Sequence, residues 1–255
     1  MDVLLAFAHP DDESIFFGGT AALLAEAGAG VHFVCATRGE GGEAGEPPLC
    51  PPGELGRVRS EELACAVRAL GGGALAFLGY ADPPVDAQGE GRAFQAQLEE
   101  LGCRLAEQVR AAGAAALVTH GSNGEYGHPA HVLMQRGAWA ACRQLGDNAP
   151  ALYGFSAAFA GHPRARLANR DDPAHLVIDL GPAFEAKLAA ARCHRTQAAL
   201  FVRRASREAG RPVALDEVLM RLESLHLARP AAGGAPRDPL IAFLRRHAPD
   251  RVREG

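Results

Sequence analysis

The sequence is short of the features that mark several large classes of protein. Its 255 residues include 26 Lys and Arg against 30 Asp and Glu, and this net charge of −4 gives no electrostatic case for nucleic acid. No run approaches the ~20 apolar residues of a membrane span. The first apolar run has about six residues and no basic segment before it, unlike a secretory signal. We therefore expect a cytoplasmic protein with no membrane span and no nucleic-acid partner.

Several catalytic and cofactor signatures are missing as well. None of the six cysteines forms a C-x-x-C pair, so we expect reduced, mostly buried thiols; a disulfide from Cys50 to another cysteine is left open. No G-x-G-x-x-G follows an apolar run, which removes the fingerprint of a dinucleotide-binding protein. There is also no G-x-S-x-G and no nucleophilic cysteine signature. The remaining composition, 48% hydrophobic and 22% charged, suits a globular protein.

Short apolar runs alternate with amphipathic stretches along most of the chain. Through residue 202, runs of strand length are each followed by a stretch of helical periodicity. This alternation predicts a three-layer, Rossmann-like α/β sandwich with a mostly parallel sheet, formed by residues 1–202. Helical patterns at 215–227 and 240–247 predict that residues 203–255 form a C-terminal helical extension packed on that core, within one overall domain.

The motif AHPDDE, residues 8–13, directly follows the first apolar run. Pro10 cannot continue a strand in mid-sheet, so these polar residues form a turn at the end of the strand. In open α/β sheets, ligands bind at the carboxyl ends of strands. An imidazole and two carboxylates at that point are suited to hold a divalent metal and a base for its water.

A second polar cluster follows the fourth apolar run and contains His120, His128 and His131. His128 and His131 lie three residues apart around a predicted helix start, so both can face one point. Because both clusters follow strands of one parallel sheet, they open on the same edge. His9, Asp12, His128 and His131 are then candidate ligands of one metal. Nitrogen and carboxylate donors suit Zn²⁺, and also Fe²⁺ or Co²⁺.

The same residues divide into separate chemical roles. A catalytic zinc keeps three protein ligands and one open position, so four candidates leave one histidine for another task. Asp11 and Asp12 are adjacent, so one would bind the metal and the other could act as general base on metal-bound water. A spare imidazolium could stabilise a tetrahedral oxyanion. Such parts fit hydrolysis of an amide or ester.

Two motifs together, AHPDDE at 8–13 and GHPAH at 127–131, resemble the paired motifs of the PIG-L/LmbE-like zinc N-deacetylases. The resemblance covers about residues 1–200 and is carried further by Thr37-Arg38-Gly39-Glu40, by Arg59 with Glu62, and by Lys187 with His194, Thr196 and Gln197. It implies an LmbE-like fold and a hydrolase that removes the N-acetyl group from a small-molecule conjugate of N-acetylglucosamine, by attack of metal-activated water.

The resemblance also implies roles for individual residues. His9, Asp12 and His131 would be the Zn²⁺ ligands, with Fe²⁺ or another divalent metal as the alternative in the cell. Asp11 would be the general base on the metal-bound water. His128 would be the cationic group that stabilises the tetrahedral intermediate.

The expected substrate contacts are Arg59 and, with less to distinguish them, Glu40 and Asp82 at the pocket wall. One position departs from the family: Ala130 stands where an Asp is common. If that Asp orients or tunes a histidine, its absence would alter the rate or the pH optimum.

Two rival functions share the same sequence features. One is an amidase of the same family that acts on a thiol conjugate. The other is a non-catalytic metal-binding or carbohydrate-binding protein, which predicts that some catalytic residue is missing. The presence of Asp11 and His128 beside the ligands disfavours that rival. The sequence does not identify the group joined to the sugar. It also leaves open whether the chain forms a homo-oligomer.

Overall fold

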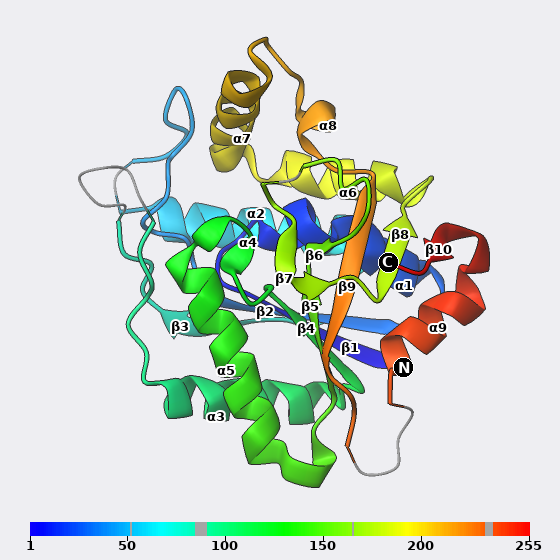
Figure 1. Ribbon diagram of the computed structural model, residues 1–255. Helices are drawn as coiled ribbons and strands as arrows, with labels where there is room; N and C mark the ends of the chain where they lie inside the picture. The colour runs from blue at the N-terminus through cyan, green and yellow to red at the C-terminus, as the bar shows by residue number, and fades with distance from the viewer. Residues whose placement is uncertain (52, 85–90, 165, 233–236) are drawn as a thin grey trace.

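An eight-stranded mixed sheet forms the middle layer of the protein in this computed structural model, which describes residues 1–51, 53–84, 91–164, 166–232 and 237–255 (Figure 1). Its strands are β1 (Asp2–Phe7), β2 (Gly30–Thr37), β3 (Leu75–Tyr80), β4 (Ala116–Thr119), β5 (Ala151–Phe155), β8 (Leu176–Asp179), β9 (Leu222–Arg229) and β10 (Val252–Arg253). They lie in the order β10-β8-β9-β5-β4-β1-β2-β3. Two short strands, β6 (Ala157–Ala158) and β7 (Asn169–Pro173), pair separately.

Most neighbouring strands of the sheet run parallel. β1 pairs in parallel with β2 and β4, β2 with β3, and β4 with β5. β9 is antiparallel to both β5 and β8, and β10 is antiparallel to β8. Because β1 and β4 are parallel neighbours, the loops at their carboxyl ends leave the sheet side by side.

Helices cover both faces of the sheet. One face carries α1 (Gly18–Glu26), α2 (Leu55–Ala69), α6 (Ala183–Cys193) and α9 (Pro239–His247), and the other carries α3 (Leu98–Ala112) and α5 (Pro129–Leu145) (Figure 1). The remaining helical elements are η1 (Glu13–Phe17), α4 (Gly124–Gly127), η2 (Gly146–Asn148), α7 (Arg195–Ala209), α8 (Leu215–Val218) and η3 (Pro249–Arg251). The predicted three-layer sandwich is confirmed. Among the described helices, none is long and apolar enough to cross a membrane.

The sequence of β1 shows why its apolar run is almost continuous. Val3, Leu5 and Phe7 pack into the core beneath α1, α2 and α6. Leu4 and Ala6 pack into the second core, beneath α3 and α5. Both faces of a central parallel strand are covered, so both sets of alternating side chains must be apolar.

The helix predicted over 215–227 is wrong beyond Val218. Residues 222–229 form strand β9, which fills the space between β5 and β8. Leu222 and Leu225 are three residues apart, as on one face of a helix. Residues 222–229 nevertheless pair with the edges of β5 and β8, and these pairings decide that the segment is a strand. Residues 203–255 therefore supply part of the main sheet, and helix α7 runs across the predicted boundary at 202.

The expectation that all cysteines are reduced is also wrong. Cys65 of α2 and Cys193 at the end of α6 form a disulfide, although 128 residues separate them. Cys35, Cys50, Cys103 and Cys142 are free. Helices α2 and α6 pack side by side on the sheet, so the fold brings together two cysteines that the sequence gives no reason to pair.

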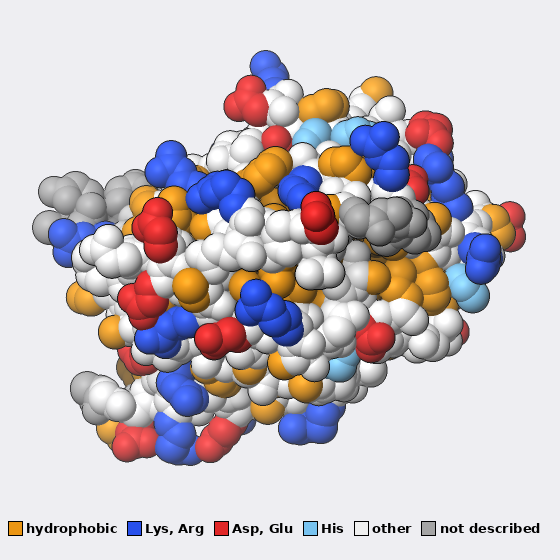
Figure 2. All heavy atoms as spheres, turned by 90° about the horizontal axis from the view of Figure 1, so that it is seen from below, with side chains coloured by type: hydrophobic (Ala, Val, Ile, Leu, Met, Phe, Trp, Pro, Cys, Tyr) orange, Lys and Arg blue, Asp and Glu red, His pale blue; other side chains and the backbone are white. Residues whose placement is uncertain are grey.

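The surface shows no concentration of one charge on the face seen in Figure 2. Lys and Arg side chains alternate there with Asp and Glu and with small apolar areas. This mixed pattern agrees with the net charge of −4.

Candidate metal centre

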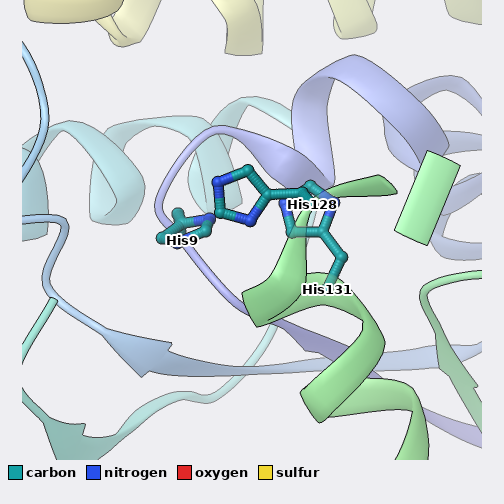
Figure 3. A group of neighbouring side chains, drawn as sticks. All are labelled: His9, His128 and His131. Carbon is teal, nitrogen blue, oxygen red and sulfur yellow. The ribbon is translucent and has the colours of Figure 1, made fainter. Parts of the chain in front are cut away.

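The polar loops after β1 and β4 meet at the carboxyl edge of the sheet. His9 comes from the first loop, and His128 and His131 come from the start of α5; Figure 3 shows their rings gathered about one point. The centroid of the His9 ring lies 4.9 Å from that of the His128 ring and 5.4 Å from that of the His131 ring. The prediction that the two motifs share one site is therefore confirmed at the level of geometry.

The turn after β1 is strained at Asp11. This residue has a φ of 123°, a conformation that costs a residue with a Cβ about 1–3 kcal/mol. Glu125, in the loop after β4, also has a positive φ, of 63°. Such strain persists only where surrounding contacts hold it, and it gathers at functional sites.

Asp12 lies among three imidazoles. Its carboxylate oxygens are 3.5 Å from His9 Nδ1, 3.3 Å from His131 Nε2 and 3.5 Å from His120 Nε2. The backbone N–H of His9 also donates to this carboxylate, at 2.9 Å. Burial alone would raise the pKa of Asp12, but the imidazoles, His131 first, hold that pKa well below its usual range. Asp12 is therefore ionised and can bind a cation.

Glu125 fixes the orientation of two histidines. His120 Nε2 accepts the N–H of Ala8 at 3.1 Å, so its Nδ1–H donates to Glu125 Oε2, at 2.9 Å. His131 Nδ1 donates to the same oxygen at 2.7 Å. Although burial opposes ionisation, His120 and His131 lower the pKa of Glu125 to about 2. An ionised, buried Glu125 thus holds Nδ1 of His131 and leaves Nε2 facing Asp12.

His131 Nε2 is the atom that fits a metal. It is buried and has no hydrogen-bond partner among the residues that the structure describes. A buried polar atom without a partner is costly, unless a ligand or ion completes it. Two sets of donor atoms meet within 4.8 Å there: His9, His128 and His131, and Asp12, His120 and His131. Imidazole nitrogens with one carboxylate are the donors that divalent zinc, iron or cobalt take.

The expected cationic role of His128 stays a prediction, and the surroundings of its ring oppose a positive charge. Burial first, and then the neighbouring His131 and His9, lower the pKa of His128 to about 3. Its Nδ1 accepts the N–H of Ala130 at 3.3 Å, which leaves the proton of the neutral ring on Nε2. The structure therefore favours a neutral hydrogen-bond donor at this position. The virtual Cβ of Gly91 would lie 2.1 Å from this Nε2, so the glycine leaves room for the ring.

Asp11, the predicted general base, is anchored on its carboxylate side by Arg59. Arg59 donates to Asp11 Oδ2 at 2.9 Å, to the carbonyl of Pro10, and to the carbonyl of Gly39 at 2.9 Å. Burial raises the pKa of Asp11 to about 6, although Arg59 opposes this shift. Arg59 is only 3% exposed and its donors serve the turn, so its expected contact with substrate stays a prediction.

The two other expected pocket residues join neighbouring loops. Asp82 follows β3, and its carboxylate lies 3.4 Å from His9 Nε2 and accepts the N–H of Gly41 at 3.3 Å. Glu40 is exposed and accepts the N–H of Asp82, also at 3.3 Å. Asp82 therefore lies at the metal centre, whereas Glu40 lies one contact further out.

Sequence reasoning missed the parts played by His120 and Glu125. The sequence places His120 in the second cluster but gives no reason to assign it a role, whereas in the structure its ring stacks on His131 with centroids 4.0 Å apart. Glu125 lies six residues before His131, with no periodicity that links the two. The one available signal was the density of polar residues in this loop, which is too unspecific to assign a partner.

Comparison with known proteins places this geometry in context. A family model described as PIG-L, GlcNAc-PI de-N-acetylase, matches residues 4–142. A 1D-myo-inositol 2-acetamido-2-deoxy-alpha-D-glucopyranoside deacetylase of Acidothermus cellulolyticus is 33% identical over 233 residues, which cover 78% of this chain and 80% of that protein. A deacetylase of the same name from Kineococcus radiotolerans is 42% identical over 149 residues, 51% of this chain. The chain spans only about half the length of some relatives: 41% of the Kineococcus protein and 53% of one from Thermobispora bispora.

Solved structures resemble the fold at lower identity. N,N'-diacetylchitobiose deacetylase from Pyrococcus horikoshii matches with a TM-score of 0.56 at 21% identity, over 77% of this chain and 70% of its own. GalB, the 4-carboxy-2-hydroxymuconate hydratase of Pseudomonas putida, matches with a TM-score of 0.59 at 22% identity, over 91% and 97%. One fold thus carries proteins with names from different reaction classes, and function must be inferred from the site.

Proposed function

The chain belongs to the PIG-L family, and from that premise we propose that it is a metal-dependent hydrolase that removes the N-acetyl group from a small-molecule conjugate of N-acetylglucosamine. The observation that carries the proposal is the unpartnered Nε2 of His131, buried against the ionised Asp12, with Asp11 next to Asp12 in the chain. A metal-ligand set with a separate carboxylate beside it is the equipment of a hydrolase that activates water.

We assign His9, Asp12 and His131 as the residues that hold the metal, with Zn²⁺ as the first candidate. When bound there, such an ion lowers the pKa of a water molecule and polarises a carbonyl oxygen. Glu125 and His120 hold His131 in place. Glu125 accepts a hydrogen bond from His131 Nδ1, and the His120 ring stacks on the His131 ring. Partners of this kind set the orientation and basicity of a ligand histidine.

Asp11 acts as the general base in this proposal. With a pKa of about 6, Asp11 is mostly ionised at neutral pH. This pKa is also close enough to the working pH for the carboxylate to accept a proton from the attacking water. The protonated carboxyl can then return this proton to the departing amine. Arg59 and the strained backbone hold the carboxylate in one place during both steps.

His128 serves as a hydrogen-bond donor to the acetyl carbonyl oxygen, where negative charge develops as water attacks. A neutral imidazole with its proton on Nε2 supplies such a donor without a buried charge, and it keeps the same protonation state throughout the reaction. Ala130 contributes its main-chain N–H to His128, and its side chain is buried in the apolar core.

The substrate class follows from the family and from the names of the relatives. The Acidothermus and Kineococcus proteins are named as deacetylases of an N-acetylglucosaminyl inositol. For this chain we propose the N-acetylglucosaminyl unit as the common element. Asp82, at the metal centre, and Glu40 and Arg59 remain candidate contacts for the sugar or the group joined to it.

The proposal is tested by acetate release from a panel of N-acetylglucosaminyl conjugates, measured together with the metal content of the purified protein. We expect about one metal per chain and release of acetate from at least one conjugate. A second panel of thioether-bearing amides tests the amidase alternative. Metal binding without hydrolysis of either panel would instead support the non-catalytic alternative.

Asp11→Asn separates base catalysis from metal binding. We expect a fall in turnover of about 10²–10⁴-fold, the range for loss of a general base, with metal content unchanged. Turnover at the wild-type rate would show that Asp11 is not the base.

A further inference from the structure

A buried hydrogen bond joins the Asp11 turn to a junction far along the chain. His194 Nε2 lies 2.7 Å from Glu13 Oε1, across 181 residues of sequence, and neither side chain is more than 1% exposed. We propose that Glu13 and His194 are positioning residues that hold Asp11 in its strained, productive conformation. The inference rests on the proposed role of Asp11 as base.

The main chain of Asp11 needs a partner that favours its unusual conformation. Glu13 Oε2 accepts the N–H of Asp11 at 3.0 Å. Arg59 fixes the other end of the residue, its carboxylate. Because a positive φ is unfavourable for aspartate, loss of either contact lets the turn relax and moves the carboxylate away from its place beside Asp12.

Glu13 is itself held on its other oxygen. Its Oε1 accepts hydrogen bonds from Ser14 Oγ and from His194 Nε2. With both oxygens occupied, the carboxylate cannot rotate without breaking a buried hydrogen bond, and such a loss costs more than the bond gains. His194 therefore fixes the plane of Glu13, and Glu13 fixes the N–H of Asp11.

His194 lies where helix α6 ends and α7 begins, and this junction is firmly held. Its N–H donates to Ala191 O at 3.2 Å, and its carbonyl accepts the N–H groups of Gln197 and Ala198, each at 3.0 Å. The preceding residue, Cys193, is tied to α2 by the disulfide. The imidazole thus projects from a rigid point, which a residue that orients another residue requires.

The junction provides a matched control in Glu62. This buried glutamate of α2 accepts the N–H and the hydroxyl of Thr196, at 2.9 and 2.6 Å, two residues beyond His194. It anchors the same junction with the same chemistry, but its hydrogen bonds within the described residues run to Thr196, and none of these reaches the Asp11 turn. A merely structural role predicts equal effects at Glu62 and Glu13, whereas positioning predicts an effect on turnover at Glu13 alone.

Kinetics of four single variants and one double variant test the inference. Glu13→Gln and His194→Gln should each lower kcat by about 10–100-fold, the range for partners that orient a functional residue, with KM and metal content unchanged. Glu62→Gln should leave kcat within about twofold of wild type. In Asp11→Asn, the further change Glu13→Gln should add no loss, because its effect passes through Asp11. A multiplicative loss in the double variant, or equal losses at Glu13 and Glu62, would overturn the inference.

Hydrogen exchange at the Asp11 amide provides a readout that needs no substrate. Exchange at this N–H should be at least about tenfold faster in Glu13→Ala and His194→Ala than in wild type or Glu62→Gln, because the N–H loses its acceptor or the acceptor loses its support. Unchanged exchange in both variants would refute the positioning role. If wild type released no acetate while the exchange pattern held, the proposed function would fail and the positioning of Asp11 would stand.

Discussion

Two sets of buried polar groups surround the start of the chain, and they are built differently. The ligand cluster comprises His9, Asp12, His120, Glu125 and His131. The helix-side carboxylates are Glu13, Glu62 and Glu223, which join α1, α2, η1 and β9 to the α6–α7 region. Both sets are formed by groups that are costly to bury, so the way each set is satisfied shows what it is for.

Each helix-side carboxylate accepts at least one main-chain N–H together with a side-chain donor. Glu223 accepts the N–H groups of Gly19 and Thr20, at 3.1 and 2.8 Å, and Lys187 Nζ at 2.7 Å. Glu62 is paired in the same way with Thr196. These oxygens are occupied by the protein itself, which is the pattern of structural polar groups.

The ligand cluster leaves part of its bonding capacity unused. Its imidazole nitrogens lie 3.3–3.5 Å from the Asp12 oxygens, and His131 Nε2 has no hydrogen-bond partner among the described residues. Its two carboxylates also accept main-chain N–H groups, Asp12 from His9 at 2.9 Å and Glu125 from Gly121 at 2.8 Å. Substitutions in the ligand cluster should therefore change metal binding and turnover. Substitutions at Glu62 and Glu223 should change stability, whereas Glu13 also holds the Asp11 N–H and should affect turnover.

The largest expected effect is that of His131→Ala. Loss of the unpartnered Nε2 should abolish both metal binding and turnover, because no neighbouring donor can replace a ligand placed by Glu125. Metal analysis and acetate release measure the two losses. The control is His175→Ala, at an exposed histidine outside the cluster, which should retain both. Full metal content in His131→Ala would show that His131 is not needed to hold the metal.

Lys187→Met tests the helix-side set. It leaves Glu223 buried without its cation, so the free energy of unfolding should fall by about 3–5 kcal/mol. Urea denaturation measures this fall, and metal content of the folded protein should not change. The double variant Lys187→Met with Glu223→Leu should recover much of the loss, because no uncompensated charge remains. Loss of metal without loss of stability would contradict the division of roles.

Removal of the Cys65–Cys193 disulfide should lower stability by about 2–5 kcal/mol, since 128 residues separate the cysteines and the bridge restricts the unfolded chain. Cys65→Ser is the suitable variant, because it leaves the residue beside His194 unchanged. Thermal unfolding measures the change, and Cys103→Ser, at an exposed free thiol, is the control. Turnover of the folded variant should persist; metal loss in Cys65→Ser would show that the two sets are not separable.

Glu125→Gln has the smallest expected effect and sharpens the comparison most. It removes the anion that both His120 and His131 face but keeps the shape of the side chain. Metal affinity should fall by about 10–100-fold, as for other partners of ligand histidines. Competition with a chelator measures this affinity, and Glu99→Gln, at an exposed glutamate, should leave it unchanged. A large loss of stability with unchanged metal affinity would show that Glu125 has a structural role, like the helix-side carboxylates.

The layered α/β fold and the meeting of the two motifs can be predicted from local sequence patterns. Alternation of apolar runs and helical stretches requires parallel strands, and parallel neighbours bring their carboxyl ends to one edge. That rule predicts that His9, Asp12, His128 and His131 lie near one another, and in the structure one donor set with His9 and His128 and another with Asp12 and His120 share His131.

Only the tertiary structure decided what lies behind these residues. The pairing of Cys65 with Cys193, the insertion of β9 between β5 and β8, and the contact of Glu13 with His194 join segments that are distant in the chain. Side-chain orientation also depends on partners, as when Glu125 fixes His131 and burial makes His128 neutral. Local patterns record which residues follow a strand, whereas long-range contacts and burial decide their partners and their charge.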